Sequence, residues 1–226
     1  MRRIAAALLL VFATGQVALA QSGNGAQTEA INRGVEVAAQ VLAAERAFDE
    51  QAAGEGQWTA FRATAAADAV MFVPQMVNAQ TWLAGRADPP ASVRWQPHDV
   101  FVSCDGQLAA TSGYAQWPDG SHSRFRTIWQ RQLDGNWKWV LDAGWPVSVA
   151  RPAPAQPNIR IANCERPPPS AISAVAENEA RGGAPDGSLK WLARVDGEGR
   201  GVLVLWGWNG RFLQMLSSDT MGSPQP

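Results

Sequence analysis

The residues of this chain that could do chemistry are scattered acids and histidines, not an assembled catalytic set. Asp142 lies at the end of a predicted strand, where a buried carboxylate could act as a general base if burial raised its pKa toward neutrality. His98 and Asp99 are adjacent, and neighbouring strand residues point to opposite faces, so these two cannot form a dyad with each other. The sequence has neither a Gly-rich phosphate-binding loop nor a Gly-x-Ser-x-Gly motif. Binding without catalysis therefore fits these residues best.

The alternation of side chains around Asp142 predicts that this residue points away from the core. One face of its strand is apolar and carries Trp137, Trp139 and Leu141, which leaves Lys138, Val140 and Asp142 on the opposite face. Only a β-bulge, which adds one residue to a strand, would reverse this expectation.

Hydrophobic periodicity places helices before strands. A helical pattern runs from Thr28 to Ala52, and a short second helix carries Trp58 and Phe61. Residues 68–73 read as a strand and 78–84 as one more helical turn. Four strands follow at 93–103, 108–117, 123–133 and 137–143, and tight-turn signals such as Asp105-Gly106 separate them. Helices followed by an antiparallel meander indicate an α+β fold with the helices on one face of the sheet.

The remaining sequence reads as a linker and a hairpin. Residues 148–187 form a Pro-rich linker, 188–216 a C-terminal β-hairpin with strands at 189–195 and 201–208, and 217–226 a flexible tail. The second strand is apolar on both faces, and an isolated hairpin is marginal in water. We therefore expect the hairpin to dock on the 28–147 domain, by extending its sheet or by capping it. The alternative is a separate partner-binding module with Trp206 and Trp208 as anchors.

Three segments carry a family resemblance. They are Ala44-Glu45-Arg46-Ala47-Phe48 in the long helix, Phe72-Val73-Pro74 at the end of a strand, and Asp134-Gly135-Asn136-Trp137-Lys138 in the last turn. Together they resemble the nuclear-transport-factor-2-like superfamily over residues 28–147, and within it the exported bacterial SnoaL-like and ketosteroid-isomerase-like proteins. The resemblance implies a curved sheet wrapped around helices, which forms a cone with an apolar pocket. Members include isomerases, cyclases, dehydratases and proteins that only bind, so the fold does not choose among them.

The resemblance also indicates where a site would lie. Enzymes of the superfamily place a carboxylate, a His–Asp pair or a tyrosine inside the cone, and the candidates of these types here are Asp68, His98, Asp99, Tyr114 and Asp142. We expect Trp95, Tyr114 and Trp129 to form pocket walls for a flat, apolar small molecule, although aromatic rings more commonly fill a core.

Two hypotheses of function follow. The first is a non-catalytic protein that binds a small apolar molecule or an envelope protein, and the second is a SnoaL-like isomerase, dehydratase or cyclase. An ionisable side chain inside the cone with a shifted pKa would favour the second.

Cys104 and Cys164 are the only cysteines. In an oxidising compartment they are a candidate disulfide, and the alternative is two unrelated residues on distant loops. With His98 and His122 they show no metal-ligand spacing, so neither a metal nor a cofactor is expected.

The N-terminus predicts export. Arg2 and Arg3 precede an apolar run that ends in Ala18-Leu19-Ala20, the pattern of a cleavable signal peptide over residues 1–20, and 21–27 read as a flexible tether. We expect a periplasmic or secreted protein with no membrane span after cleavage. The sequence lacks a cluster of basic residues, which argues against nucleic-acid binding, and a homodimer is among the expected assemblies.

Overall fold

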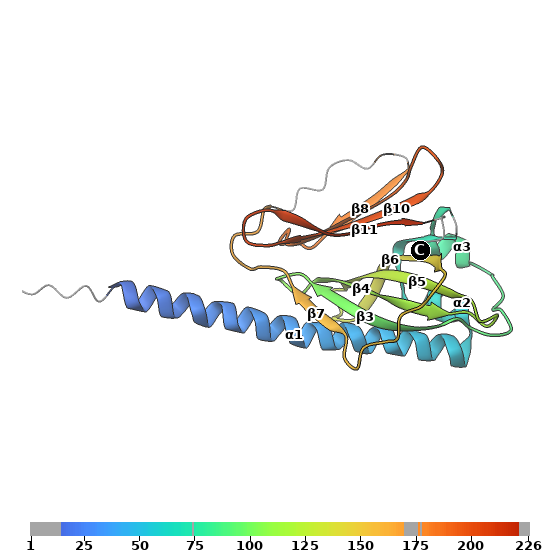
Figure 1. Cartoon of the computed structure of the whole chain (residues 1–226), viewed down its shortest axis with the longest axis horizontal. Helices are drawn as coiled ribbons and strands as arrows, with labels where there is room; N and C mark the ends of the chain where they lie inside the picture. Colours follow the sequence, from blue (N-terminus) through green and yellow to red (C-terminus); the bar gives the residue numbers. More distant parts are fainter. Residues whose placement is uncertain (1–14, 74, 170–175, 177, 222–226) are drawn as a thin grey trace, which may run out of the picture.

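The computed structural model of the protein describes residues 15–73, 75–169, 176 and 178–221, and the side chains from residue 28 onward. Its described part forms three layers: helices, a seven-stranded sheet and a separate four-stranded sheet (Figure 1). The α+β class expected from the sequence is confirmed. No described helix is both long and apolar enough to cross a membrane.

The helical layer consists of α1 (Gly15–Glu55), α2 (Gln57–Thr64) and α3 (Ala79–Leu83). The α1 helix is longer than the sequence predicted, and it includes residues 21–27, which we expected to form a flexible tether. From Ala38 onward its buried stripe follows the predicted spacing, with Leu42 and Phe48, whereas Ile31 and Val35 nearer the N-terminus are exposed. Gly56, with φ at 118°, ends the helix and turns the chain into α2. The α1 helix thus packs on the sheet through the apolar side of an amphipathic helix.

The seven-stranded sheet has the order β2-β1-β6-β5-β4-β3-β7. Its strands are β1 (Ala65–Phe72), β2 (Met76–Asn78), β3 (Arg94–Val102), β4 (Leu108–Gln116), β5 (His122–Arg131), β6 (Trp137–Val147) and β7 (Asn158–Ile161). The predicted meander is present, because β3, β4, β5 and β6 pair antiparallel in sequence order. The sheet is mixed, since β1 runs parallel to β6 and β7 parallel to β3.

The second sheet has the order β11-β10-β9-β8 and is antiparallel throughout. It contains β8 (Glu179–Gly183), β9 (Leu189–Val195), β10 (Gly201–Trp208) and β11 (Leu213–Met221). It does not extend the first sheet. It packs on the sheet's outer face, where Leu203 and Leu205 join the hydrophobic core and Asp219 forms an ion pair with Arg126.

Two strands, β7 of the first sheet and β8 of the second, lie inside the segment 148–187, which its prolines had marked as a linker. Each strand occupies a stretch without proline, so each can donate its backbone amides to a neighbouring strand.

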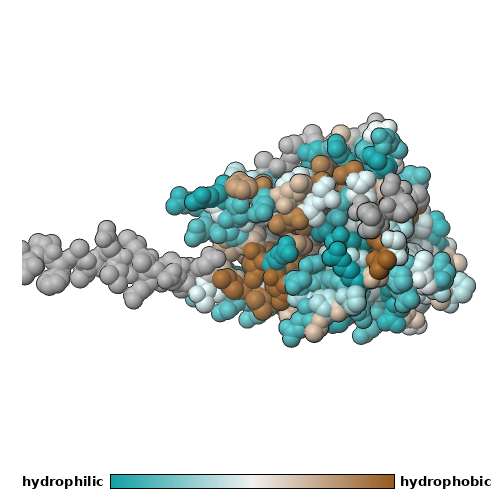
Figure 2. Space-filling view, in the orientation of Figure 1, coloured by the Kyte–Doolittle hydropathy of each residue, from teal (hydrophilic) through white to brown (hydrophobic). Residues whose placement is uncertain are grey.

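Gly34 of α1 lies against Ile161 of β7, which places this strand beside the helix. Apolar surface is exposed there, from Ile31 and Val35 of α1 and Ile159 of β7, and the space-filling view shows apolar surface where α1 leaves the body (Figure 2).

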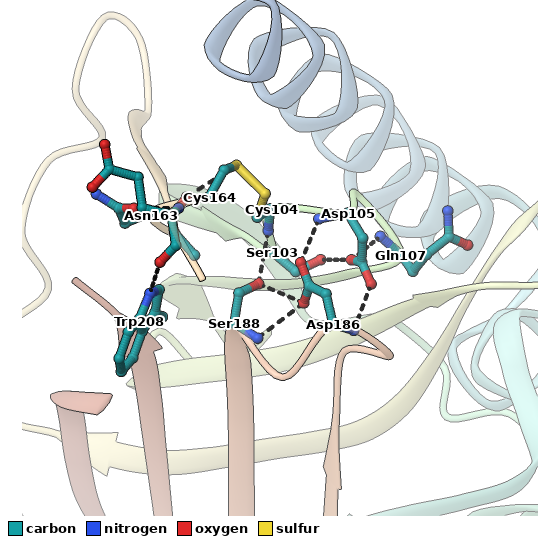
Figure 3. The surroundings of a disulfide bond; sticks show 11 residues. Ser103, Cys104, Asp105, Gln107, Asn163, Cys164, Asp186, Ser188 and Trp208 are labelled. Carbon is teal, nitrogen blue, oxygen red and sulfur yellow. Dashed lines mark hydrogen bonds between the residues drawn. A yellow bond between two sulfur atoms is a disulfide. The ribbon is translucent and has the colours of Figure 1, made fainter. Parts of the chain in front are cut away.

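Cys104 and Cys164 form a disulfide, with their Cα atoms 5.2 Å apart. The bond joins the turn after β3 to the segment after β7 (Figure 3). Beside it, the amide of Asp105 donates to Asp186 Oδ2 and the amide of Asp186 donates to Asp105 Oδ2, at 2.8 and 3.1 Å. This turn of the first sheet is therefore tied to the β8–β9 turn of the second.

Candidate functional site

A β-bulge in β6 determines which face Asp142 occupies. Trp139 pairs with Trp129 of β5, and the next partner pair is Leu141 with Ile128, so Val140 is an extra residue. The bulge shifts the alternation by one, which turns Asp142 toward the helices and Leu141 toward the second sheet. The prediction that Asp142 points away from the interior is therefore wrong.

Asp142 lies in a cavity of about 400 Å³ between the helices and the seven-stranded sheet. This volume is within the range of small-molecule sites. Most of the cavity wall is aromatic or aliphatic, and its aromatic side chains are Phe48, Trp58, Phe61, Phe72, Trp95, Trp117, Phe125 and Trp145. The polar groups are few: Asp142, Thr127 and Gln57, with Ser121, His122 and Ser123. Asp142 is the only carboxylate among the lining residues.

Burial in this apolar setting raises the pKa of Asp142 to about 7. Thr127 Oγ1 donates a hydrogen bond to Asp142 Oδ1 at 2.8 Å, which lowers the pKa in part, and the nearby carboxyl of Glu45 raises it. At neutral pH a substantial fraction of Asp142 is thus protonated and a substantial fraction is ionised. Such a group can both accept and return a proton.

Glu45 of α1 organises the side chains next to the cavity. Its carboxylate accepts hydrogen bonds from Trp95 Nε1 at 2.7 Å, from Trp129 Nε1 at 2.8 Å and from Thr111 Oγ1. Burial raises the pKa of Glu45, and these three donors lower it in part. The sequence reasoning missed Glu45, although one signal was available: it is a carboxylate in the middle of the apolar stripe of α1.

One of the three predicted wall residues lines the cavity. Trp95 lines the cavity, and Trp129 lies behind it, fully buried against Phe48, with their ring centroids 6.2 Å apart. Tyr114 does not line the cavity. It lies on the opposite face of β4, where its ring centroid is 5.0 Å from that of His98.

The other candidates lie outside the cavity. Asp68 is exposed on β1, and Asp99 accepts a hydrogen bond from Asn158 Nδ2. Burial is the main cause of a lowered pKa at His98, which lies at a register shift of β3. No group of three or more His, Cys, Asp or Glu side chains that could hold a metal ion occurs in the described part of the chain.

The arrangement of helices on one face of a sheet is the one that the resemblance to the nuclear-transport-factor-2-like superfamily predicted. No protein-family model matches the chain, and no curated protein matches it.

Solved structures are similar at low sequence identity. A "putative ketosteroid isomerase" from Parabacteroides distasonis is 15% identical with a TM-score of 0.38, and the match covers 45% of this chain and 84% of that chain. A "putative aromatic ring hydroxylase" from Novosphingobium aromaticivorans is 14% identical with a TM-score of 0.36, covering 49% and 88%. A "putative ketosteroid isomerase" from Shewanella frigidimarina is 15% identical with a TM-score of 0.30, covering 50% and 94%. These similarities do not determine an activity.

Proposed function

We propose that the protein binds a small apolar organic molecule in the cavity and that Asp142 transfers a proton on it, as in an isomerase, dehydratase or cyclase. One observation carries this proposal: a single carboxyl, with a pKa near neutrality, lies inside an otherwise apolar, aromatic-walled cavity. The sequence favoured binding without catalysis because it placed Asp142 on the other face. The bulge at Val140 removes that objection.

The reaction class that suits this site is removal of a proton from carbon next to a carbonyl group. The ionised Asp142 accepts the proton, and the protonated side chain returns it to another carbon of the same molecule, so that the carboxylate is regenerated. Gln57 is a suitable donor for the substrate oxygen. Its Oε1 accepts from the amide of Val93 at 3.1 Å, while its Nε2 has no hydrogen-bond partner among the described residues.

Proton exchange tests the proposal without knowledge of the natural substrate. A panel of cyclic ketones and enones is incubated with the protein in deuterated water, and loss of the proton signal next to the carbonyl is followed by NMR. We expect exchange with the wild-type protein, increasing with pH as Asp142 ionises, and at least tenfold slower exchange with Asp142→Asn. Asp68→Asn is the matched control, because it neutralises an exposed carboxylate outside the cavity.

The test also separates the two hypotheses of function. Ligands that bind the wild-type protein and Asp142→Asn equally, with no exchange in either, would make the protein a binder and overturn the catalytic proposal.

We further propose that the protein acts outside the cytoplasm. The disulfide between Cys104 and Cys164 is consistent with an oxidising compartment, since such bonds are rare where thiols are kept reduced.

A further inference from the structure

A second depression, of about 370 Å³, adjoins the cavity that holds Asp142. The two share three lining residues, Trp95, Ala115 and His122. Unlike the cavity, the second depression is polar and is lined by His98 and Tyr114 from β3 and β4, and by Arg151 from the segment after β6. An apolar space and a polar one therefore meet at His122.

Two arginines, Arg94 and Arg151, and one carboxylate, Asp49, line the second depression, which leaves one positive charge in excess. Arg94 already pairs with Asp49, at 2.6 Å. Arg151 has no ion pair and no hydrogen bond within the described residues. Its charge reaches His98, and together with that of Arg124 it helps to lower the pKa of that imidazole, after the larger effect of burial.

Arg124 lies near the second depression but does not line it. Its guanidinium carbon lies 6.0 Å from the centre of the Tyr114 ring, which lines the depression. Its Nε is buried and has no hydrogen-bond partner in the part of the chain that the structure describes. The acid next to His98, Asp99, already accepts a hydrogen bond from Asn158 Nδ2. Arg124 therefore adds positive charge near the depression, as its effect on the pKa of His98 shows, without contacting the space itself.

We infer that this depression binds the carboxylate of a ligand whose apolar body occupies the cavity. The inference rests on the proposed function and names its substrate class: an apolar ring or chain with one carboxylate at its end. The apolar part lies among the aromatic walls of the cavity. The carboxylate lies in the second depression, where it meets Arg151, His98 and His122. Arginine is well suited to this role, because it binds carboxylates through two parallel hydrogen bonds.

Two matched compounds test the inference: 2-naphthylacetate and its uncharged amide, 2-naphthylacetamide. Their dissociation constants are measured by calorimetry at pH 7.5 and low salt. We expect the carboxylate to bind the wild-type protein about tenfold more tightly than the amide, and added salt to reduce this preference. Arg151→Ala is expected to remove most of the preference while the affinity for the amide stays unchanged. Arg151 is exposed in a loop, so this variant should fold.

Arg160→Ala is the matched control, since this exposed arginine stacks on Phe101 and lines neither space. It should leave both affinities unchanged. Equal affinity of the wild-type protein for the two compounds would overturn the carboxylate site but not the cavity. Binding of neither compound would overturn the cavity as a ligand site, and with it this inference.

Discussion

Gly201 of the second sheet lies directly against the ring of Phe72, which lines the cavity of the first. A Cβ atom at position 201 would be 2.7 Å from Cε1 of Phe72 and 2.8 Å from Cε of Met221. Since Phe72 is both a cavity wall and a contact of β10, the second sheet fixes the position of part of the wall. The two sheets are thus coupled at the candidate site.

Gly201→Ala should therefore affect both stability and binding. The added methyl group overpacks the interface, which we expect to lower the free energy of unfolding by about 1–3 kcal/mol. It also displaces Phe72, so the affinity for 2-naphthylacetamide should fall several-fold. Denaturant titration and calorimetry measure the two effects.

The control is Gly197→Ala, in the turn between β9 and β10, where an added Cβ meets nothing within 4 Å. It should change neither stability nor affinity appreciably. Loss of stability in Gly201→Ala without loss of affinity would show that the second sheet does not shape the cavity.

Asp142 should make the protein less stable as pH rises. Its pKa is raised from 3.8 to about 7 in the folded state, so the folded protein keeps this proton where the unfolded chain has lost it. The free energy of unfolding therefore falls between about pH 4 and pH 7, by up to about 4 kcal/mol from this group.

Asp142→Asn lacks this titration, so its stability relative to wild type should be unchanged near pH 4 and higher at pH 8. Urea denaturation at both pH values measures the difference, and Asp68→Asn should follow the wild type. Glu45 contributes to the slope in all three proteins, and because its carboxyl interacts with Asp142, its contribution cancels only between the wild type and Asp68→Asn. Parallel pH curves for wild type and Asp142→Asn would contradict the placement of Asp142.

The disulfide should be present and stabilising. Labelling of free thiols under denaturing, non-reducing conditions should detect none, since Cys104 and Cys164 pair. Replacing both by alanine should cost about 4 kcal/mol, because the bond closes a loop with a sequence separation of 60. Two reactive thiols per chain would refute the pairing.

Export should remove the N-terminus. N-terminal sequencing of the protein from its native host should begin at Gln21 or within a residue or two, after Ala18-Leu19-Ala20. An intact Met1 on membrane-bound protein would contradict cleavage.

Most of the fold could be predicted from the sequence, because its strands are bounded by strong turn signals. The meander strands and the pair 189–195 and 201–208 lie where hydrophobic runs end in Asp-Gly turns. The strands β7 and β8 were missed for the opposite reason. Both are short and lie among prolines, and only their partners in space make them strands.

The candidate site was less predictable. Strict alternation failed at Val140, because a bulge leaves no mark in a run of apolar residues, and one extra residue moved Asp142 to the other face. Tyr114 was placed by residue type, but its face depends on the register of β4, and that register points the ring away from the cavity. Alternating hydrophobicity in the sequence identifies a strand. Which face each side chain occupies depends on bulges and on the pairing register, and the site depends on that face.

The ion pair between Arg126 and Asp219 provides the last prediction, because it joins the two sheets through two buried side chains. Arg126 Nε donates to Asp219 Oδ2 at 3.0 Å, and the two side chains are 1% and 9% exposed. Burial lowers the pKa of Arg126, and Asp219 opposes that effect. Asp219→Ala would leave a buried arginine without its partner, which should lower the free energy of unfolding by about 3–5 kcal/mol.

Glu198→Ala is the control, because Glu198 pairs with Arg200 at the surface and 71% of its side chain is exposed. Loss of this surface pair should lower the free energy of unfolding by less than about 1 kcal/mol. Denaturant titrations of the three proteins give both differences. If Asp219→Ala were no more destabilising than Glu198→Ala, the second sheet would not be held on the first in the way that the structure shows.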